Sequence, residues 1–73
     1  MNYETAIQIL IENDIFPKKE IYVDQVDSRH VVGLRVYCPP LLKDKKTDFI
    51  KGLLGNMARV NYLPNNDEIV IEI

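Results

Sequence analysis

The fold is decided by residues 20–38, which read EIYVDQVDSRHVVGLRVYC. β-branched and aromatic residues dominate both halves, and the polar tripeptide Asp27-Ser28-Arg29 separates them, a pattern typical of two strands joined by a short turn. Apolar side chains alternate along the second half, so one set is expected to face a core. We therefore predict a β-hairpin with strands over 20–26 and 30–38 and an inward set of Ile21, Val23, Val32, Leu34, Val36 and Cys38.

An amphipathic helix is expected on each side of this hairpin. Residues 2–13 carry apolar side chains three and four positions apart, and Pro17 lies beyond the expected end of this helix. Pro39 and Pro40 stop the second strand, because proline has no N–H to donate to a sheet. A second helix is then expected, with a cap at Asp44 or Thr47 and an apolar stripe of Phe49, Ile50, Leu53, Leu54, Met57 and Val60.

The C-terminal residues 68–73, EIVIEI, alternate isoleucine with other residues and predict a third strand after the turn at 64–67. The order of elements is then α-β-β-α-β. A right-handed crossover through the second helix places the third strand beside the first, which gives an antiparallel sheet in order 2-1-3. The sequence thus predicts a single α+β domain over residues 1–73, with a three-stranded antiparallel sheet and both helices on one face.

Composition restricts the possible classes of function. The chain has 73 residues, 11 acidic against 9 basic side chains and a formal net charge of −2 at pH 7, which argues against general affinity for nucleic acid or acidic lipid. A single cysteine and a single histidine allow neither an internal disulfide nor a four-ligand zinc site. No segment has the pattern of a signal peptide or the roughly 20 apolar residues of a membrane span. We expect a complete small open reading frame beginning at Met1, a cytoplasmic protein with no cofactor, no metal and no membrane partner.

The face of the sheet opposite the helices is the first candidate binding surface. Because both helices cover one side, the other side must meet either water or a partner. Aromatic residues and arginine are enriched in binding faces, and this face is expected to hold Tyr22, Val31, Arg35, Tyr37 and Val70. One alternative is an ordinary solvated sheet that carries β-forming residues because strands favour them. Another is that two copies pair through this face or through an open sheet edge.

The second helix offers a candidate surface built on glycine. Gly52 and Gly55 each cost about 0.8–1 kcal/mol relative to alanine in a helix interior. With Arg59 they are expected to form a flat strip against which the backbone of a partner packs closely. The alternative is that Gly55 breaks or ends the helix.

The approach to the second helix is basic. Lys43, Lys45 and Lys46 cluster near the helix N-terminus, where the helix dipole disfavours cations. A bound anion, such as a phosphate or an acidic partner surface, would offset this conflict. The alternative is a solvated loop that lysines keep soluble, since neither a glycine-rich cradle nor an arginine fork accompanies the cluster.

The sequence contains no catalytic constellation. His30 and Cys38 lie at opposite ends of one predicted strand, about eight residues apart at roughly 3.3 Å each, which is too far for a Cys–His pair. No phosphate-binding loop, nucleophile elbow or metalloprotease helix occurs. We predict no catalytic residue and no enzyme activity.

The function that fits these features best is a non-catalytic protein-binding module whose partner is another protein. Short, cysteine-poor single-domain chains are common among phage and mobile-element inhibitors and adaptors, an association of size and composition alone. One alternative is a nucleic-acid-binding module in which Tyr22 and Tyr37 stack on bases while Arg35 and the lysines of 43–46 contact phosphates. A second alternative is a self-assembling structural protein whose partner is another copy of itself.

Overall fold

The computed structural model describes all 73 residues and contains two α-helices and one antiparallel sheet, which confirms the predicted α+β class. The elements in chain order are α1 (Tyr3–Glu12), η1 (Lys18–Glu20), β1 (Ile21–Asp27), β2 (His30–Tyr37), η2 (Pro40–Leu42), α2 (Lys43–Leu54), η3 (Gly55–Met57), β3 (Arg59–Leu63) and β4 (Glu68–Glu72), where η marks a short 3₁₀ turn.

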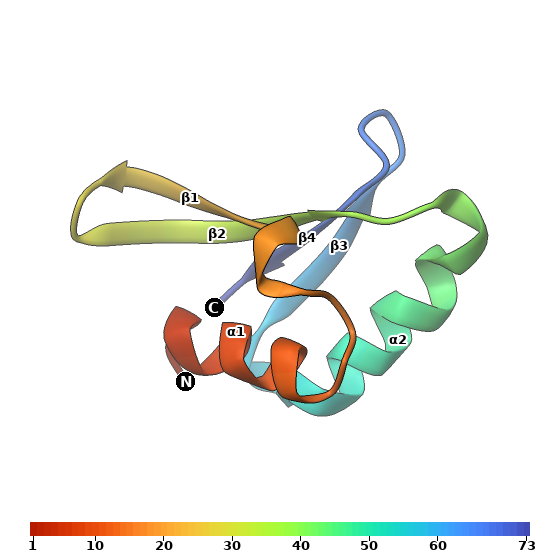
Figure 1. Cartoon of the computed structure of the whole chain (residues 1–73), viewed down its shortest axis with the longest axis horizontal. Helices are drawn as coiled ribbons and strands as arrows, with labels where there is room; N and C mark the ends of the chain where they lie inside the picture. Colours follow the sequence, from red (N-terminus) through yellow and green to blue (C-terminus); the bar gives the residue numbers. More distant parts are fainter.

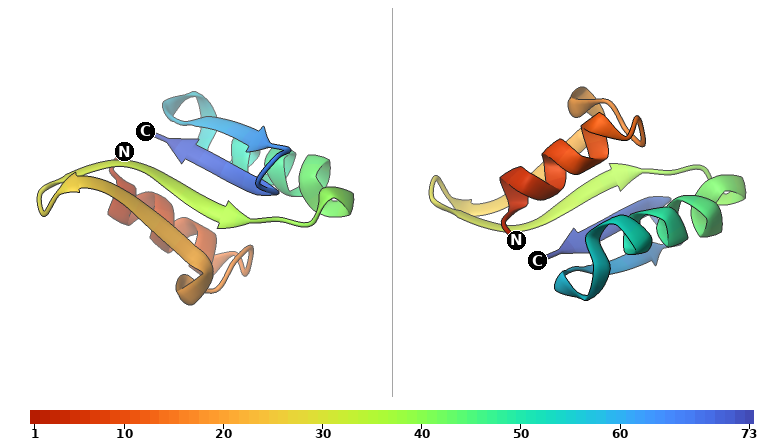
Figure 2. Two further views of the ribbon diagram at one scale, coloured as in Figure 1. Left: turned by 90° about the horizontal axis from the view of Figure 1, so that it is seen from above. Right: turned by 90° about the horizontal axis from the view of Figure 1, so that it is seen from below.

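The sheet has four strands in the order β1-β2-β4-β3 (Figures 1 and 2). The predicted three-stranded sheet in order 2-1-3 is therefore wrong in both the number and the order of strands. The extra strand, β3, forms a hairpin with β4, so the two chain segments after α2 enter the sheet together. β4 pairs with β2 rather than with β1, which leaves β1 and β3 as the two edges.

The missed strand follows from the early end of α2. The predicted helix runs to Val60, but α2 ends at Leu54 and Gly55 occupies its C-cap with φ 65° and ψ −155°. This backbone conformation is accessible almost only to glycine, and it turns the chain out of the helix. Residues 59–63 are then free to extend, and their alternating burial places Val60 in the core.

Both helices cover one face of the sheet, as predicted, and Figure 1 shows them side by side beneath it. Hydrophobic side chains from the sheet and from both helices close a single core between these two layers. No polar or charged side chain is buried in it. The buried hydrophobic residues are Ala6, Leu10, Ile15, Phe16, Leu34, Val36, Cys38, Ile50, Leu54, Val60, Ile69 and Ile71.

The start and the end of α1 are fixed by asparagines. The side-chain oxygen of Asn2 accepts a hydrogen bond from the backbone N–H of Thr5 at 2.8 Å, which satisfies one of the orphan donors of the first turn. At the other end the side-chain amide of Asn13 donates to the carbonyl of Ile9, and Asp14 adopts a positive φ of 54° that stops the helix. Neither α1 nor α2 combines the length and apolar character that a membrane-crossing helix needs.

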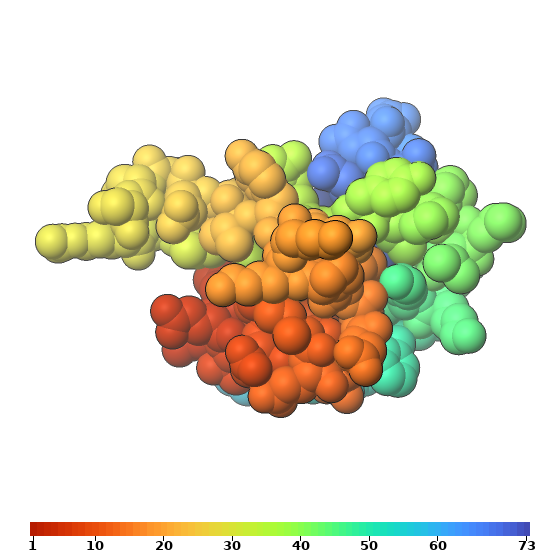
Figure 3. All heavy atoms as spheres, in the orientation of Figure 1, coloured from red at the N-terminus to blue at the C-terminus, as the bar shows by residue number.

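The β1–β2 hairpin projects past the helices as an arm, visible at the left of Figures 1 and 3. The Asp27 carboxylate holds its tip by accepting from the backbone N–H groups of Arg29 and His30 at 2.8 and 3.0 Å and by contacting His30 Nδ1 at 2.8 Å. These hydrogen bonds, led by that from Arg29, hold the pKa of Asp27 below its ordinary value. The arm is therefore ordered by its own turn rather than by core packing.

Two register shifts interrupt the hairpin near its tip. Asp24 pairs with Gly33 while Gln25 pairs with Val31, and a second shift separates Gln25 from Asp27. The prediction that Val32 is buried in the core is wrong. Val32 is 49% exposed, because the arm extends beyond the helices at this position. Bulges of this kind redirect side chains, which strict alternation does not anticipate.

Candidate functional site

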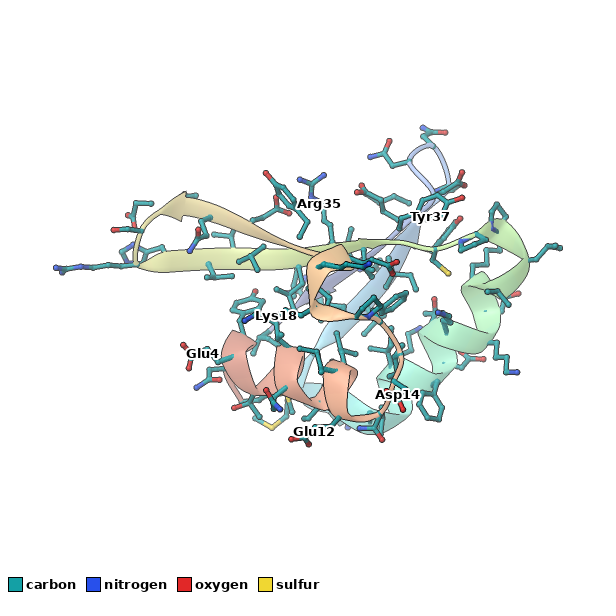
Figure 4. The ribbon with its side chains drawn as sticks, in the orientation of Figure 1. Glu4, Glu12, Asp14, Lys18, Arg35 and Tyr37 are labelled. Atoms are coloured by element: carbon teal, nitrogen blue, oxygen red, sulfur yellow. The ribbon has the colours of Figure 1, made fainter.

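The uncovered face of the sheet collects side chains from all four strands. Strand register sets them in rows: Tyr22 lies opposite Arg35, Arg35 opposite Val70, and Val70 opposite Asn61. A neighbouring row runs from Tyr37 through Glu68 to Leu63. Figure 4 shows Arg35 and Tyr37 on the side of the sheet away from Glu4, Glu12 and Asp14. We refer to this surface as the outer face; its members are Tyr22, Asp24, Gly33, Arg35, Tyr37, Arg59, Asn61, Leu63, Glu68, Val70 and Glu72.

Arg35 is the centre of the outer face. Its Nε donates to Asp24 Oδ2 at 2.7 Å, and its Nη1 lies 3.6 Å from Glu68 Oε2. The guanidinium carbon lies 4.4 Å from the centre of the Tyr22 ring, within the range of a cation–π contact. Side chains from β1 and β4 thus surround one cation on β2.

These contacts neutralise and orient the Arg35 side chain. The hydrogen bond that Arg35 donates to Asp24 is the main cause that raises the pKa of Arg35, and the nearby carboxylate charges add to it. The charge of the guanidinium is shared between two carboxylates, so little of it is left for a free anion. The same contacts hold Tyr22 in place, although its side chain is 59% exposed.

Tyr37 and Val70 complete the predicted members of this surface. Tyr37 lies at the end of β2, opposite Glu68, with 61% of its side chain exposed. Val70 is half-buried in the row of Arg35. The outer face therefore brings together Tyr22, Arg35, Tyr37 and Val70 as the sequence analysis expected.

Val31, the fifth predicted residue, does not join this cluster. It lies beyond the register shift, near the tip of the hairpin arm, and lines a surface hollow with Tyr3, Met57 and Ile73. Beyond the shift Val31 pairs with Gln25 instead of Val26, so the alternation that would place it on the face of Arg35 no longer holds.

The predicted strip of Gly52, Gly55 and Arg59 does not exist on one helix face. Gly52 lies in α2, Gly55 is the C-cap, and Arg59 begins β3, where it pairs with Glu72 on the outer face. The alternative interpretation, that Gly55 ends the helix, is confirmed. Nothing lies within 4 Å of a Cβ placed on either glycine, so neither is required by close packing within the chain.

The lysines near the start of α2 are divided among different contacts. The Lys46 amine donates to the Ile15 carbonyl at 3.1 Å and lies 4.3 Å from the centre of the Phe16 ring. Lys43 lies 5.5 Å from the centre of the Tyr62 ring. Lys45 lines a shallow hollow with Leu42 and Phe49. Two of the three cations thus contact the chain itself.

Sequence reasoning missed the contribution of β3 to the outer face and the contact of Glu68 with Arg35. Cross-strand pairing of Arg35 with Asp24 follows from the hairpin alone, but its contact with Glu68 requires β4 to lie beside β2. The signal for β3 is present in the alternation Arg59-Val60-Asn61-Tyr62-Leu63 directly before a turn. Met57 and Val60 also have helical spacing, so the sequence pattern assigns these residues to the second helix instead.

Two titratable groups outside the outer face, Cys38 and Tyr62, contribute to the packing between β2 and the β3–β4 hairpin. Cys38 is buried at the end of β2, and desolvation is the main cause that raises the pKa of its thiol. The Tyr62 hydroxyl lies 3.1 Å from the Cys38 carbonyl and 3.0 Å from Asp67 Oδ1. Tyr62 therefore links the β3–β4 hairpin to the end of β2. His30 lies at the tip of the arm, at the opposite end of β2 from Cys38.

Tyr62 is expected to ionise only at strongly alkaline pH. Desolvation, followed by the hydrogen bond with Asp67, raises its pKa to about 12. Since the folded state favours the neutral phenol, its contribution to stability is complete below the unfolded pKa of about 10 and is lost as pH rises towards the folded value. Near-ultraviolet absorbance of tyrosinate against pH measures this step.

The Tyr62→Phe variant is the control for that titration. It should lack the ionisation step near pH 12 that the wild type shows. An unchanged titration curve in this variant would contradict the raised pKa of Tyr62.

Comparisons of the chain with models of protein families, with curated proteins and with solved structures find no match.

Proposed function

We propose that this chain is a non-catalytic protein-binding module that docks another protein through the outer face. The observation that carries the proposal is the ordered cluster around Arg35, with two exposed tyrosines, on a sheet face that no other part of the chain covers. Tyrosine and arginine are, with tryptophan, the residues enriched among the anchors of protein interfaces.

The chemistry of the outer face suits a protein surface. Tyr22 and Tyr37 offer large, rigid contact areas that lose little conformational entropy on binding. Arg35 is already paired, so a partner need not supply a counter-charge to bury it. Carboxylates and Arg59 lie around this centre, which provides the polar rim that interfaces commonly have.

The nucleic-acid alternative receives less support. It requires Tyr22, Arg35 and the lysines of α2 to act on one strand of nucleic acid. Arg35 is engaged by two carboxylates, and Lys46 contacts Ile15 and Phe16 on the helix side of the sheet. Carboxylates on the outer face would also repel a phosphate backbone.

An inhibitor or an adaptor, encoded by a phage or mobile element, is the role that we propose for such a module. A small domain of 73 residues with a single hydrophobic core fits a protein that acts by occupying a surface of its partner. A cytoplasmic location is part of the proposal, because an unpaired cysteine fits a reducing compartment.

Replacing both Tyr22 and Tyr37 with alanine is expected to weaken partner binding by about tenfold to a hundredfold, because it removes both aromatic anchors. The partner is first captured from a lysate of the native host with the tagged wild-type chain, then purified. Isothermal titration calorimetry with the purified partner then gives Kd for each variant.

The matched control is Leu41→Ala. Leu41 is 97% exposed in η2, outside the sheet, so this variant also loses an exposed apolar side chain. Circular dichroism should show both variants folded. Equal Kd values for the double variant and the wild type would contradict docking through the outer face. A gel shift with generic single-stranded nucleic acid at low salt, lost in the double variant, would favour the nucleic-acid alternative instead.

A further inference from the structure

The two edges of the sheet differ in how they are protected against pairing with another strand. β1 is interrupted by two register shifts and carries Asp24 and Asp27, and both bulges and charges are devices that discourage edge-to-edge association. β3 pairs with β4 in unbroken register over all its five residues, contains no proline and has a single charge, Arg59, at its first position. The β3 edge is therefore regular and unprotected.

The backbone groups on the free side of β3 have no partners within the chain. β3 pairs with β4 alone, and no side chain donates to or accepts from its backbone. The exception is the Leu63 carbonyl, which accepts from the Asn66 N–H in the adjoining turn. A hollow of about 350 Å³ lies beside this edge, lined by Lys51, Gly55, Asn56, Ala58, Arg59, Val60 and Asn61.

We propose that the occupant of this edge is a second copy of the chain, paired antiparallel through β3 about a two-fold axis at Asn61. In this register Asn61 lies opposite Asn61 of the second copy, Val60 opposite its Tyr62, and Arg59 opposite its Leu63. The pairing completes the exposed ladder of both copies and joins them in one eight-stranded antiparallel sheet.

The side chains of β3 fit this register on both faces. On the helix side, the apolar row of Ile71 and Val60 continues into Tyr62 and Ile69 of the second copy, a β-branched residue against an aromatic one. On the outer face the two Asn61 amides face each other, and each can donate and accept. No like charges of β3 face each other across the interface, because Arg59 of each copy lies opposite Leu63 of the other.

A strand from an unrelated protein would satisfy the same backbone groups, but only a second copy uses the self-complementary order of these five residues. A chain of this size also buries a small core, and association is a common means of adding to it. The proposal goes beyond the proposed function: it requires no partner other than the chain itself, and its test needs only the purified protein.

Sedimentation velocity and light scattering over a range of concentrations up to the millimolar range test the proposal. The wild type is expected to form dimers. Asn61→Lys and Asn61→Asp each place two like charges opposite each other across the axis, at the Cα separation of about 4.5–5.5 Å that facing antiparallel residues have. Each variant alone is expected to raise the dimer dissociation constant by about tenfold or more, an effect that added salt partly reverses.

Mixing the two variants is the decisive step. A lysine then faces an aspartate across the axis, and the mixture should recover the dimer that each variant loses. Asn65→Lys and Asn65→Asp are the matched controls, because Asn65 is exposed in the turn beyond β3 and should leave the dimer unchanged. A monomeric wild type, or a dimer that the Asn61 variants do not weaken, overturns the proposal; failure of the mixture to recover the dimer overturns the Asn61 register.

Discussion

Replacing Ile71 with alanine is expected to lower the free energy of unfolding by about 2–5 kcal/mol, the range for a fully buried aliphatic residue cut back to a methyl group. Ile71 lies in β4, a central strand, and its side chain has no exposed surface. It faces Leu34 of β2 on one side and Val60 of β3 on the other. The cavity would therefore open between three strands and the helices that cover them.

The loss is large for a domain of this size, whose total stability is on the order of 5–10 kcal/mol. Urea unfolding followed by circular dichroism measures it. Ile73→Ala is the matched control, because it removes the same atoms from a residue that is 37% exposed at the end of the chain. We expect a loss below about 1 kcal/mol there. Similar losses for the two variants would show that the core is not centred on β4.

Elements in which the apolar residues follow a single clear spacing, helical or alternating, could be predicted from the sequence. The α1 stripe, the β1–β2 hairpin and the strict alternation of β4 are each local patterns, and the structure confirms all three elements. The helix layer on one face could also be predicted, because two amphipathic helices and a half-buried sheet have few other ways to close a core.

The strand order could not be predicted in the same way. Residues 57–63 fit two periods at once, since Met57 and Val60 keep helical spacing while Val60 and Tyr62 alternate. Which pattern prevails depends on where the helix ends. Once β3 exists, it pairs with β4 through a short turn, and the order β1-β2-β4-β3 follows from packing between distant segments.

The candidate site could likewise be predicted only where it depends on local pairing within one hairpin. Tyr22, Arg35 and Tyr37 share the outer face because they lie on one hairpin with a regular register up to Asp24. Val31 is displaced because the register shifts beyond that point, and a bulge leaves no clear mark in one sequence. Glu68 joins Arg35 only because β4 lies beside β2.

The helix end that separates the two readings of residues 57–63 can be tested at Gly55. Gly55→Ala is expected to lower the free energy of unfolding by about 1–3 kcal/mol, because φ 65° with ψ −155° strains any residue that carries a Cβ. A Cβ at this position would meet nothing within 4 Å, so the cost comes from the backbone and not from a clash. Urea unfolding measures the loss.

Gly52→Ala makes the comparison decisive, because it adds the same methyl group one turn earlier in the same helix. Gly52 is exposed within α2, and its Cβ would also meet open space. Alanine there should raise the free energy of unfolding by about 0.5–1 kcal/mol, since it restricts the unfolded chain and favours the helix. Two chemically identical substitutions three residues apart are thus expected to act in opposite directions. If both stabilised the protein, α2 would tolerate continuation through Gly55, and the switch from helix to β3 would have to arise from strand pairing rather than from this glycine.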